Sequence, residues 1–327
     1  MANSMNQLYP LRFEPILRRY LWGGRRLETV LGKSLPDGNN YAESWEIVDH
    51  REDQSVVVAG PLAGCTLREL ATRYGLQLFG RHNPQEQFPL LFKFLDSQRT
   101  LSVQVHPNDE QARKLDPPDL GKTEAWVVLA AEPGSKIYTG LKPGVDCQQL
   151  RRHLEQGTCE QALHAFEPAV GDCLLILAGT VHALGEGLVT AEIQQASDTT
   201  FRLFDWNRVD ADGCPRQLHI EQSLATIDFS RGPVAPQIPQ PADRPGVERL
   251  VSCDKFVLNR WELVRPTTIG GDHRFRLLAV IDGEVEVAGD PTGSPLRIGN
   301  TLLLPAECGA TSLTPQGRAV FLEMHLP

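Results

Sequence analysis

Four residues of this chain have types and spacing suited to binding a metal ion: Gln104, His106, Glu124 and His182. Each lies beside an apolar stretch that predicts a short β-strand ending in a turn. Gln104 and His106 are two positions apart, so on a strand their side chains point to the same face. Imidazole nitrogens and carboxamide or carboxylate oxygens suit a borderline divalent cation such as zinc. Because no cysteine adjoins these residues, the pattern does not indicate a structural zinc finger.

The elements that must position these residues are predicted to be mainly β-strands. The chain contains 28 glycines and 24 prolines, and these residues separate short apolar runs. Many short strands with Gly/Pro turns favour a β-sandwich or barrel. The predicted strands include residues 55–59, 101–105, 125–130, 173–177, 256–264, 275–281 and 301–304. Short helices are predicted at residues 66–75, 109–114, 146–157 and 219–227, with Thr66 and Asp146 as N-caps.

A proline-rich segment predicts how the chain is divided. Residues 231–246 contain five prolines in sixteen residues, which predicts an extended linker. It separates a predicted metal-binding catalytic domain with short helical segments, residues 1–230, from a C-terminal β domain, residues 247–327. Residues 171–182 and 299–309 share one pattern: a glycine, a polar residue, an apolar strand and a turn. Only the first of these segments ends in a histidine, so we predict two related barrels, one with a metal and one without.

The composition argues against several classes of function. The chain of 327 residues is 41% hydrophobic and 22% charged, which is ordinary for a soluble globular protein. Its formal net charge of -9 argues against broad binding to nucleic acid or to anionic membranes. Residues 1–20 lack the apolar core of a secretory signal, and no apolar run approaches the ~18 residues of a membrane span. The seven cysteines are scattered, which predicts reduced thiols in a cytoplasmic protein.

Seven stretches of the chain together resemble the type I mannose-6-phosphate isomerases, or phosphomannose isomerases, of the cupin superfamily. They follow the family's order and are residues 22–24, 43–47, 93–96, 101–109, 121–126, 178–183 and 192–208. The last of them is by itself highly specific. The overall length resembles the shorter bacterial branch, which lacks a large inserted helical domain. The chain departs from the family's pattern at Leu177, where proline is usual, and at Asn207, where aspartate is more frequent.

The resemblance implies a bicupin-like fold of two jelly-roll barrels and a specific reaction. The expected enzyme interconverts mannose 6-phosphate and fructose 6-phosphate through a cis-enediolate. The resemblance also implies one zinc ion per chain, with Gln104, His106, Glu124 and His182 as its ligands. The implied partner is therefore a small sugar phosphate, with no nucleic acid and no membrane involved.

The resemblance also assigns roles to other residues. Family positions point to Glu192 as the proton shuttle, to Lys122 as a neighbouring acid/base or polarising group, and to Arg202 as the group that stabilises a developing oxyanion. The matching phosphate-binding positions are Lys93, Ser102 and Arg208. Ser102 lies two residues before Gln104, so phosphate and metal are expected along one side of the barrel. Further candidates for the pocket wall are Trp22, Glu46 and His50.

Several alternatives stay open at this point. The base is either Glu192 or Lys122, and the native metal is any zinc-like divalent cation. A cupin that uses iron for oxygen chemistry is a rival, although Gln104 and the stretch around Arg202 argue against it. A sugar-phosphate sensor without catalytic activity and an isomerase of unphosphorylated sugars are two others. The sequence is compatible with a monomer or a homodimer, and the role of the C-terminal barrel is open.

Overall fold

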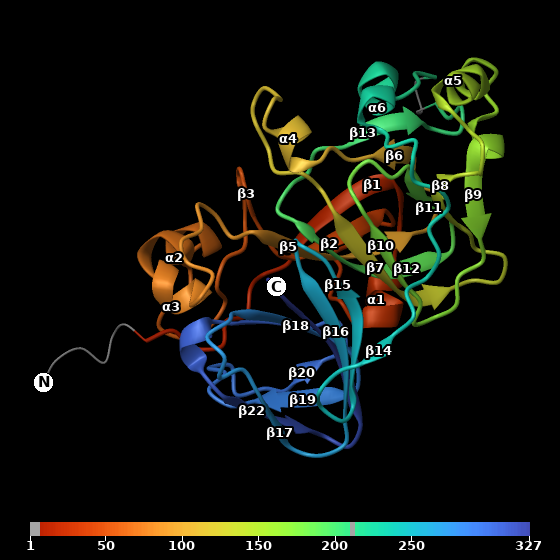
Figure 1. Cartoon of the computed structure of the whole chain (residues 1–327). Coiled ribbons are helices and arrows are strands. Elements are labelled where there is room, and N and C mark those ends of the chain that lie inside the picture. The colour runs from red at the N-terminus through yellow and green to blue at the C-terminus, as the bar shows by residue number, and fades with distance from the viewer. Residues whose placement is uncertain (1–6, 210–212) are drawn as a thin grey trace, which may run out of the picture.

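The computed structural model describes residues 7–209 and 213–327 and shows a mainly β protein with two halves (Figure 1). The first half contains a six-stranded and a five-stranded sheet. In spatial order the six-stranded sheet consists of β1 (Ile16–Gly24), β2 (Tyr41–Ile47), β5 (Leu90–Ser97), β12 (Leu188–Gln195), β7 (Glu124–Ala131) and β10 (Cys173–Ile176). The five-stranded sheet consists of β13 (Phe201–Phe204), β6 (Val103–Val105), β11 (His182–Leu184), β8 (Ile137–Leu141) and β9 (Leu163–Phe166).

The second half also contains one six-stranded sheet and one smaller sheet. Its six-stranded sheet consists of β14 (Gln240–Pro241), β15 (Val247–Ser252), β16 (Val257–Leu263), β23 (Ala319–His325), β18 (Arg276–Asp282) and β21 (Thr301–Leu304). A four-stranded sheet consists of β17 (Thr267–Ile269), β22 (Thr311–Pro315), β19 (Glu284–Val287) and β20 (Leu296–Arg297). The two segments that share a sequence pattern, residues 171–182 and 299–309, contain β10 and β21. Each of these strands lies at one edge of its six-stranded sheet. This agrees with the prediction of two related halves.

The neighbouring strands β5 and β12 of the first six-stranded sheet are buried on both faces. On β5, Phe92 and Phe94 belong to a large core shared by both halves of the molecule, whereas Leu95 packs inside the first half. The shared core also contains Leu258 and Leu322 from the second half. Because successive strand residues point to opposite faces, β5 alternates between these two environments. Burial on both faces explains why these strands appear in the sequence as nearly continuous apolar runs.

The structure confirms the four predicted helices. They are α2 (Leu67–Arg73), α4 (Asp109–Ala112), α5 (Cys147–Glu155) and α6 (Ile220–Thr226). The predicted N-caps Thr66 and Asp146 each accept a hydrogen bond from the third residue of their helix. Sequence reasoning missed α1 (Arg26–Leu31) and α3 (Gly75–Phe79), as well as the 3₁₀ helices η1 (Cys159–Ala162) and η2 (Ala306–Cys308). None of the helices in the described part of the chain is long and apolar enough to cross a membrane.

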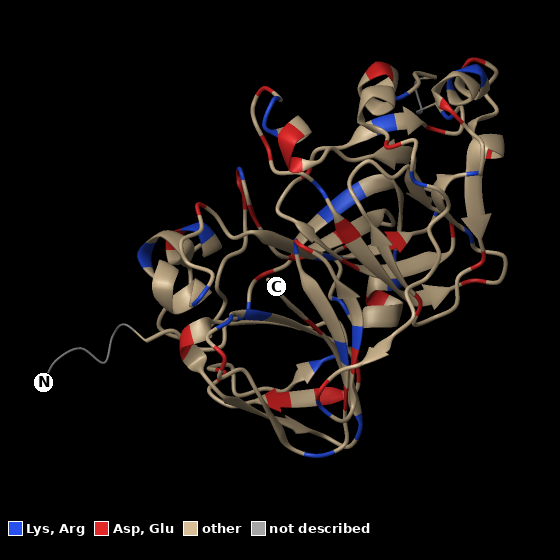
Figure 2. Ribbon diagram, in the orientation of Figure 1, with Lys and Arg blue, Asp and Glu red and all other residues tan. Residues whose placement is uncertain are grey.

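Two other predicted elements differ in detail. Residues 55–59 are not a regular strand, because Val56 and Val57 form only isolated bridges. The proline-rich segment is extended but lies against the first half: the Val234 amide donates to Thr139 and the Gln237 amide to Cys173. The segment contains β14. The division into domains at residues 231–246 stays a prediction. Acidic and basic residues are interspersed over both halves (Figure 2).

Candidate active site

Three buried side chains from two facing sheets meet inside the first half. His106 directly follows β6, Glu124 begins β7 and His182 begins β11. The Nε2 atom of His106 lies 3.4 Å from one oxygen of Glu124, and Nε2 of His182 lies 3.3 Å from the other. The three possible ligand atoms lie within 4.8 Å of one another. This spacing allows one cation to contact all three residues.

Backbone carbonyls fix the orientation of both imidazoles. Nδ1 of His106 lies 3.0 Å from the carbonyl oxygen of Thr199, and Nδ1 of His182 lies 2.9 Å from that of Thr180. A neutral imidazole that donates from Nδ1 leaves the Nε2 lone pair free, and here both Nε2 atoms face Glu124. Burial and the Lys122 ammonium lower the pKa of His106 to about 3. Burial also lowers the pKa of His182, so both rings are neutral at pH 7.

The unsatisfied carboxylate oxygens of Glu124 favour a bound cation between Glu124 and the two histidines. Both carboxylate oxygens and Nε2 of His182 are buried without a hydrogen-bond partner among the described residues. Burial alone would raise the pKa of Glu124, but the Lys122 ammonium, 3.1 Å away, contributes to holding it well below its usual range. Buried ionised groups without hydrogen bonds are costly, and a metal ion is one of the few partners that satisfies them. The donor set of two imidazoles and one carboxylate is typical of an open catalytic zinc site.

Gln104 lies next to this cluster and beside a cavity. On the sheet it pairs with His182 on one side and with Arg202 on the other. It lines a cavity of about 230 Å³ that is formed by residues of the first half. The lining includes Trp22, Lys93, Ser102, Gln104, Lys122, Glu192 and Arg202. The cavity therefore brings together most of the residues that the sequence singled out.

Glu192 lies in this cavity between two lysines. Its carboxylate is 3.4 Å from Nζ of Lys93 and 3.9 Å from Nζ of Lys122, and it accepts a 3.1 Å hydrogen bond from the indole of Trp126. Burial and the nearby charge of Glu124 raise the pKa of Glu192 to about 7, although the two lysines oppose this change. A carboxylate whose pKa lies near neutrality and which is held in a fixed position is suited to proton transfer at physiological pH.

The two lysines have different surroundings. Lys93 also contacts Glu43 at 3.4 Å. Burial alone would lower the pKa of Lys93, but Glu192 and Glu43 raise it above its ordinary value, so this lysine stays charged. Lys122 lies 3.1 Å from Nε2 of His106, close to the candidate metal ligands.

The position of Lys122 depends on the glycine before it. A Cβ atom on Gly121 would lie 2.5 Å from the backbone nitrogen of Asp109. Since real Cβ atoms do not approach this closely, only glycine fits where the chain passes from α4 towards Lys122 and β7.

Ser102, Arg202 and Arg216 also line the cavity. The Arg202 guanidinium donates to the Ser102 hydroxyl at 3.2 Å and to the Gln217 carbonyl. Arg208 lies in a smaller neighbouring cavity, where it donates to Thr100 and pairs with Asp205.

The family of the chain follows from its relatives. It is 34% identical over 324 residues to mannose-6-phosphate isomerase ManA of Bacillus subtilis, a match that covers 97% of this chain and 99% of that protein. The chain belongs to the type I phosphomannose isomerase family. The family's catalytic-domain model matches residues 11–124, and the mannose-6-phosphate isomerase cupin-domain model matches residues 247–323.

Two further relatives of this phosphomannose isomerase family agree. A mannose-6-phosphate isomerase of Streptococcus mutans is 34% identical over 298 residues, which covers 90% of this chain and 92% of that protein. The crystal structure of the mannose 6-phosphate isomerase from Bacillus subtilis superimposes with a TM-score of 0.88 at 28% identity, covering 98% of this chain and 100% of that one. The fold of this phosphomannose isomerase family member is therefore that of a cupin protein.

The predicted pocket wall is only partly right. Trp22 lines the cavity, whereas Glu46 and His50 are not among its lining residues. Glu46 pairs with Lys33, and His50 contacts Asp119. Sequence reasoning missed nine lining residues: Tyr20, Glu43, Leu95, Leu101, Trp126, Leu184, Asp198, Thr200 and Arg216. Glu43, Asp198 and Thr200 lie within the family-like stretches, which is the signal that could have identified them.

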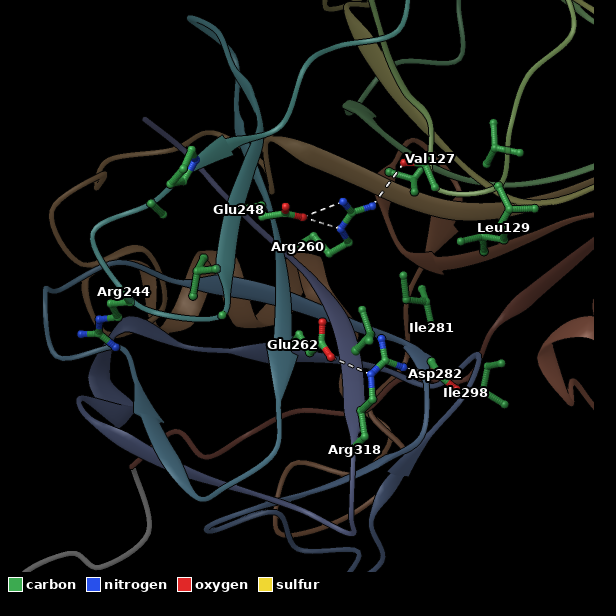
Figure 3. A pocket seen from close by; sticks show the side chains of 18 of the residues that line it. Val127, Leu129, Arg244, Glu248, Arg260, Glu262, Ile281, Asp282, Ile298 and Arg318 are labelled. Atoms are coloured by element: carbon green, nitrogen blue, oxygen red, sulfur yellow. Dashed lines mark hydrogen bonds and ion pairs between the residues drawn. The ribbon is translucent and has the colours of Figure 1, made fainter.

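A larger hollow of about 1020 Å³ lies between the two halves (Figure 3). Its charged side chains largely neutralise one another, because Arg260 pairs with Glu248 and Arg318 pairs with Glu262 (Figure 3). The smaller cavity is lined by Gln104 and by the proton-transfer candidates Lys122 and Glu192, so it is the candidate active site.

Proposed function

We propose that this protein interconverts mannose 6-phosphate and fructose 6-phosphate, using one zinc ion per chain. The observation that supports this most strongly is the buried cluster of His106, Glu124 and His182. Lys122 joins this cluster to the cavity, because it lies 3.1 Å from Glu124 and 3.9 Å from Glu192. Relatives that match nearly the whole chain bear the name mannose-6-phosphate isomerase. The reaction needs a polarised carbonyl and a group that moves a proton between neighbouring carbons, and this cavity offers residues for both tasks.

In this proposal Gln104, His106, Glu124 and His182 hold the zinc ion. When bound, zinc supplies a Lewis acid that polarises the sugar carbonyl and stabilises negative charge. The protein's own part is to keep the ligand atoms in place through the two backbone carbonyls that orient the imidazoles.

Glu192 is the proposed base. Its carboxylate removes the proton from C2 of the open-chain aldose, which gives a cis-enediolate, and returns it to C1 to form the ketose. The indole of Trp126 fixes one carboxylate oxygen, and the other faces the two lysines. Lys122 is placed to exchange a proton with the substrate oxygens, and its ammonium also offers a hydrogen-bond donor to a developing oxyanion.

Arg202→Ala is expected to lower kcat by ~10²-fold or more while zinc stays bound, which is the scale of losing one donor to the transition state. The guanidinium is held by Ser102 and Gln217, so it is pre-positioned at the cavity. Steady-state kinetics with metal analysis of the same sample measures this effect. A rise in KM with unchanged kcat would instead mean that Arg202 binds substrate and transition state equally.

Arg208→Ala is expected to raise KM for mannose 6-phosphate by roughly 10-fold or more, the scale of a hydrogen bond to a charged group. The proposed phosphate site comprises Lys93, Ser102 and Arg208, with Arg208 in the neighbouring small cavity. Arg216→Ala is the comparison, because Arg216 lines both cavities and binds the same Asp205. If only the Arg216 variant loses affinity for phosphorylated sugar, the assignment of Arg208 is wrong.

The experiment that tests the proposed function is turnover of mannose 6-phosphate coupled to detection of fructose 6-phosphate. The protein is assayed as purified, after chelation and after zinc is restored. We expect activity to disappear on chelation and to return with zinc. Absence of turnover in the zinc-loaded protein would contradict the proposal.

A further inference from the structure

A buried carboxylate outside the cavity anchors the segment that joins two parts of the active site. Residues 196–200 connect β12, which carries Glu192, to β13, which carries Arg202. Asp198 and Thr200 from this segment line the cavity. The segment therefore links the proposed base to the proposed oxyanion-stabilising arginine, and anything that fixes it affects both sides of the site.

Asp119 binds this segment through several hydrogen bonds. One carboxylate oxygen accepts from the Thr199 hydroxyl at 2.7 Å and from the Ser197 hydroxyl at 3.1 Å. The other accepts from the Leu120 amide at 2.8 Å and lies 3.3 Å from Nε2 of His50. The Asp119 side chain is only 5% exposed. Both oxygens are thus fully engaged, and the carboxylate joins the turn before β7 to the segment after β12.

The same threonine contacts a candidate metal ligand. While its hydroxyl donates to Asp119, the carbonyl oxygen of Thr199 lies 3.0 Å from Nδ1 of His106. Asp119 is therefore two contacts away from His106. A group that does not contact the metal but hydrogen-bonds to a ligating imidazole fixes the orientation and tautomer of that imidazole and raises its affinity for metal. From the sequence alone, Asp119 has no predicted role and His50 is predicted to lie on the pocket wall.

We propose that Asp119 is a positioning residue: it holds Thr199 so that the Thr199 carbonyl keeps His106 directed at Glu124. The inference rests on the proposed function in one respect, since it takes His106 to be a metal ligand. His50 supports Asp119 from the β3 (Asp49–His50) to β4 (Asp53–Gln54) hairpin, which accounts for its burial away from the cavity.

The charge state of Asp119 agrees with this arrangement. Burial alone would raise the pKa of Asp119, but hydrogen bonds from His50 and Thr199 outweigh that effect and lower the pKa to about 2. The side chain is therefore an acceptor only, and its bonds to both hydroxyl groups have a fixed direction.

The test measures zinc affinity by competition with a chromogenic chelator, with the absorption spectrum of the cobalt-loaded protein as a second readout of ligand geometry. Asp119→Asn removes the charge and places an NH₂ group among donors. Thr199→Val removes only the hydroxyl bonded to Asp119 and keeps the carbonyl, and Thr199→Ser restores the hydroxyl. We expect Asp119→Asn and Thr199→Val to weaken zinc binding by ~10–100-fold, the range for outer groups around a metal site. Thr199→Ser should bind like the wild type.

Asp290→Asn is the matched control for general loss of stability. Asp290 is also a buried carboxylate that accepts from a threonine hydroxyl and a backbone amide, but it lies in the second half and pairs with Arg12. This variant should unfold more easily yet keep wild-type zinc affinity. If Asp119→Asn and Thr199→Val behave like Asp290→Asn, with an unchanged cobalt spectrum, Asp119 has only a structural role and the inference is overturned.

These measurements distinguish a failure of the inference about Asp119 from a failure of the proposed function. A wild-type protein that binds zinc but does not isomerise mannose 6-phosphate would contradict the function, while the affinities of the variants would still decide the role of Asp119. A wild-type protein that binds no zinc would overturn the inference, because His106 would then not be a ligand.

Discussion

Replacing His182 with alanine is expected to remove the metal ion and the isomerase activity together. His182 supplies one of two imidazole nitrogens that face Glu124, and it is completely buried. Substitution of residues that only support the metal ligands already lowers metal affinity by ~10–100-fold. Loss of a direct ligand should therefore lower the affinity for zinc by well over ~100-fold. Elemental analysis after dialysis and chelator competition measure this effect, and turnover is assayed on the same samples.

His164→Ala is a suitable control for this experiment. His164 lies on β9 and stacks on Phe166, so its removal should leave zinc content and turnover unchanged. If His182→Ala retained one zinc ion per chain, the ligand assignment would be wrong even if activity fell. If it lost zinc but kept full activity, the metal would not take part in the reaction.

Replacing Glu192 with glutamine is expected to lower kcat by ~10²–10⁴-fold without loss of zinc, the range for removing a general base. Glutamine keeps nearly the same shape and can still accept the hydrogen bond from Trp126, but it cannot take up a proton. Lys122→Met is the parallel variant, because the base was left open between these two residues. Metal content, kcat and KM of both variants distinguish a lost base from a lost ligand.

The pH profile gives an independent measure of the same group. A base works in its ionised form, so kcat/KM should fall as the pH drops below the pKa of Glu192, which burial and Glu124 raise to about 7. A divalent cation bound to Glu124 offsets part of the negative charge of Glu124. In the zinc-loaded enzyme, the acidic limb, where kcat/KM falls with decreasing pH, is therefore expected between the ordinary pKa of glutamate and pH 7. This limb should be absent in Glu192→Gln and present in Lys122→Met. The reverse result would identify Lys122 as the base.

All residues that line the candidate active-site cavity belong to the first half of the molecule. The six-stranded sheet of the second half shares a core with the outer face of the sheet that carries Lys93, Glu124 and Glu192. The alternation along β5, β7 and β12 therefore fixes which residues enter the cavity and which enter the shared core. A shift of one residue in any of these strands would exchange the two sets.

The sequence by itself identified most residues of the candidate site. Gln104, His106, Glu124 and His182 were predicted as ligands. The structure brings possible ligand atoms of the last three within 4.8 Å of one another and pairs Gln104 with His182 on the sheet. The mainly β fold and the helices capped by Thr66 and Asp146 also followed from local patterns. These features are local because they depend on strand periodicity, on capping and on short stretches whose residues are close neighbours in the chain.

Only the tertiary structure decided how distant segments meet. The pairing of β12 with both β5 and β7 places Glu192 between two lysines, and this environment raises its pKa. The irregularity where β13 pairs with β6, near Arg202, is likewise not visible in the residue pattern. The contact of Asp119 with Thr199 joins residues 80 positions apart. Such contacts depend on the register between strands and on the packing of two sheets, and these are set by the whole core and not by the residues on either side of a contact.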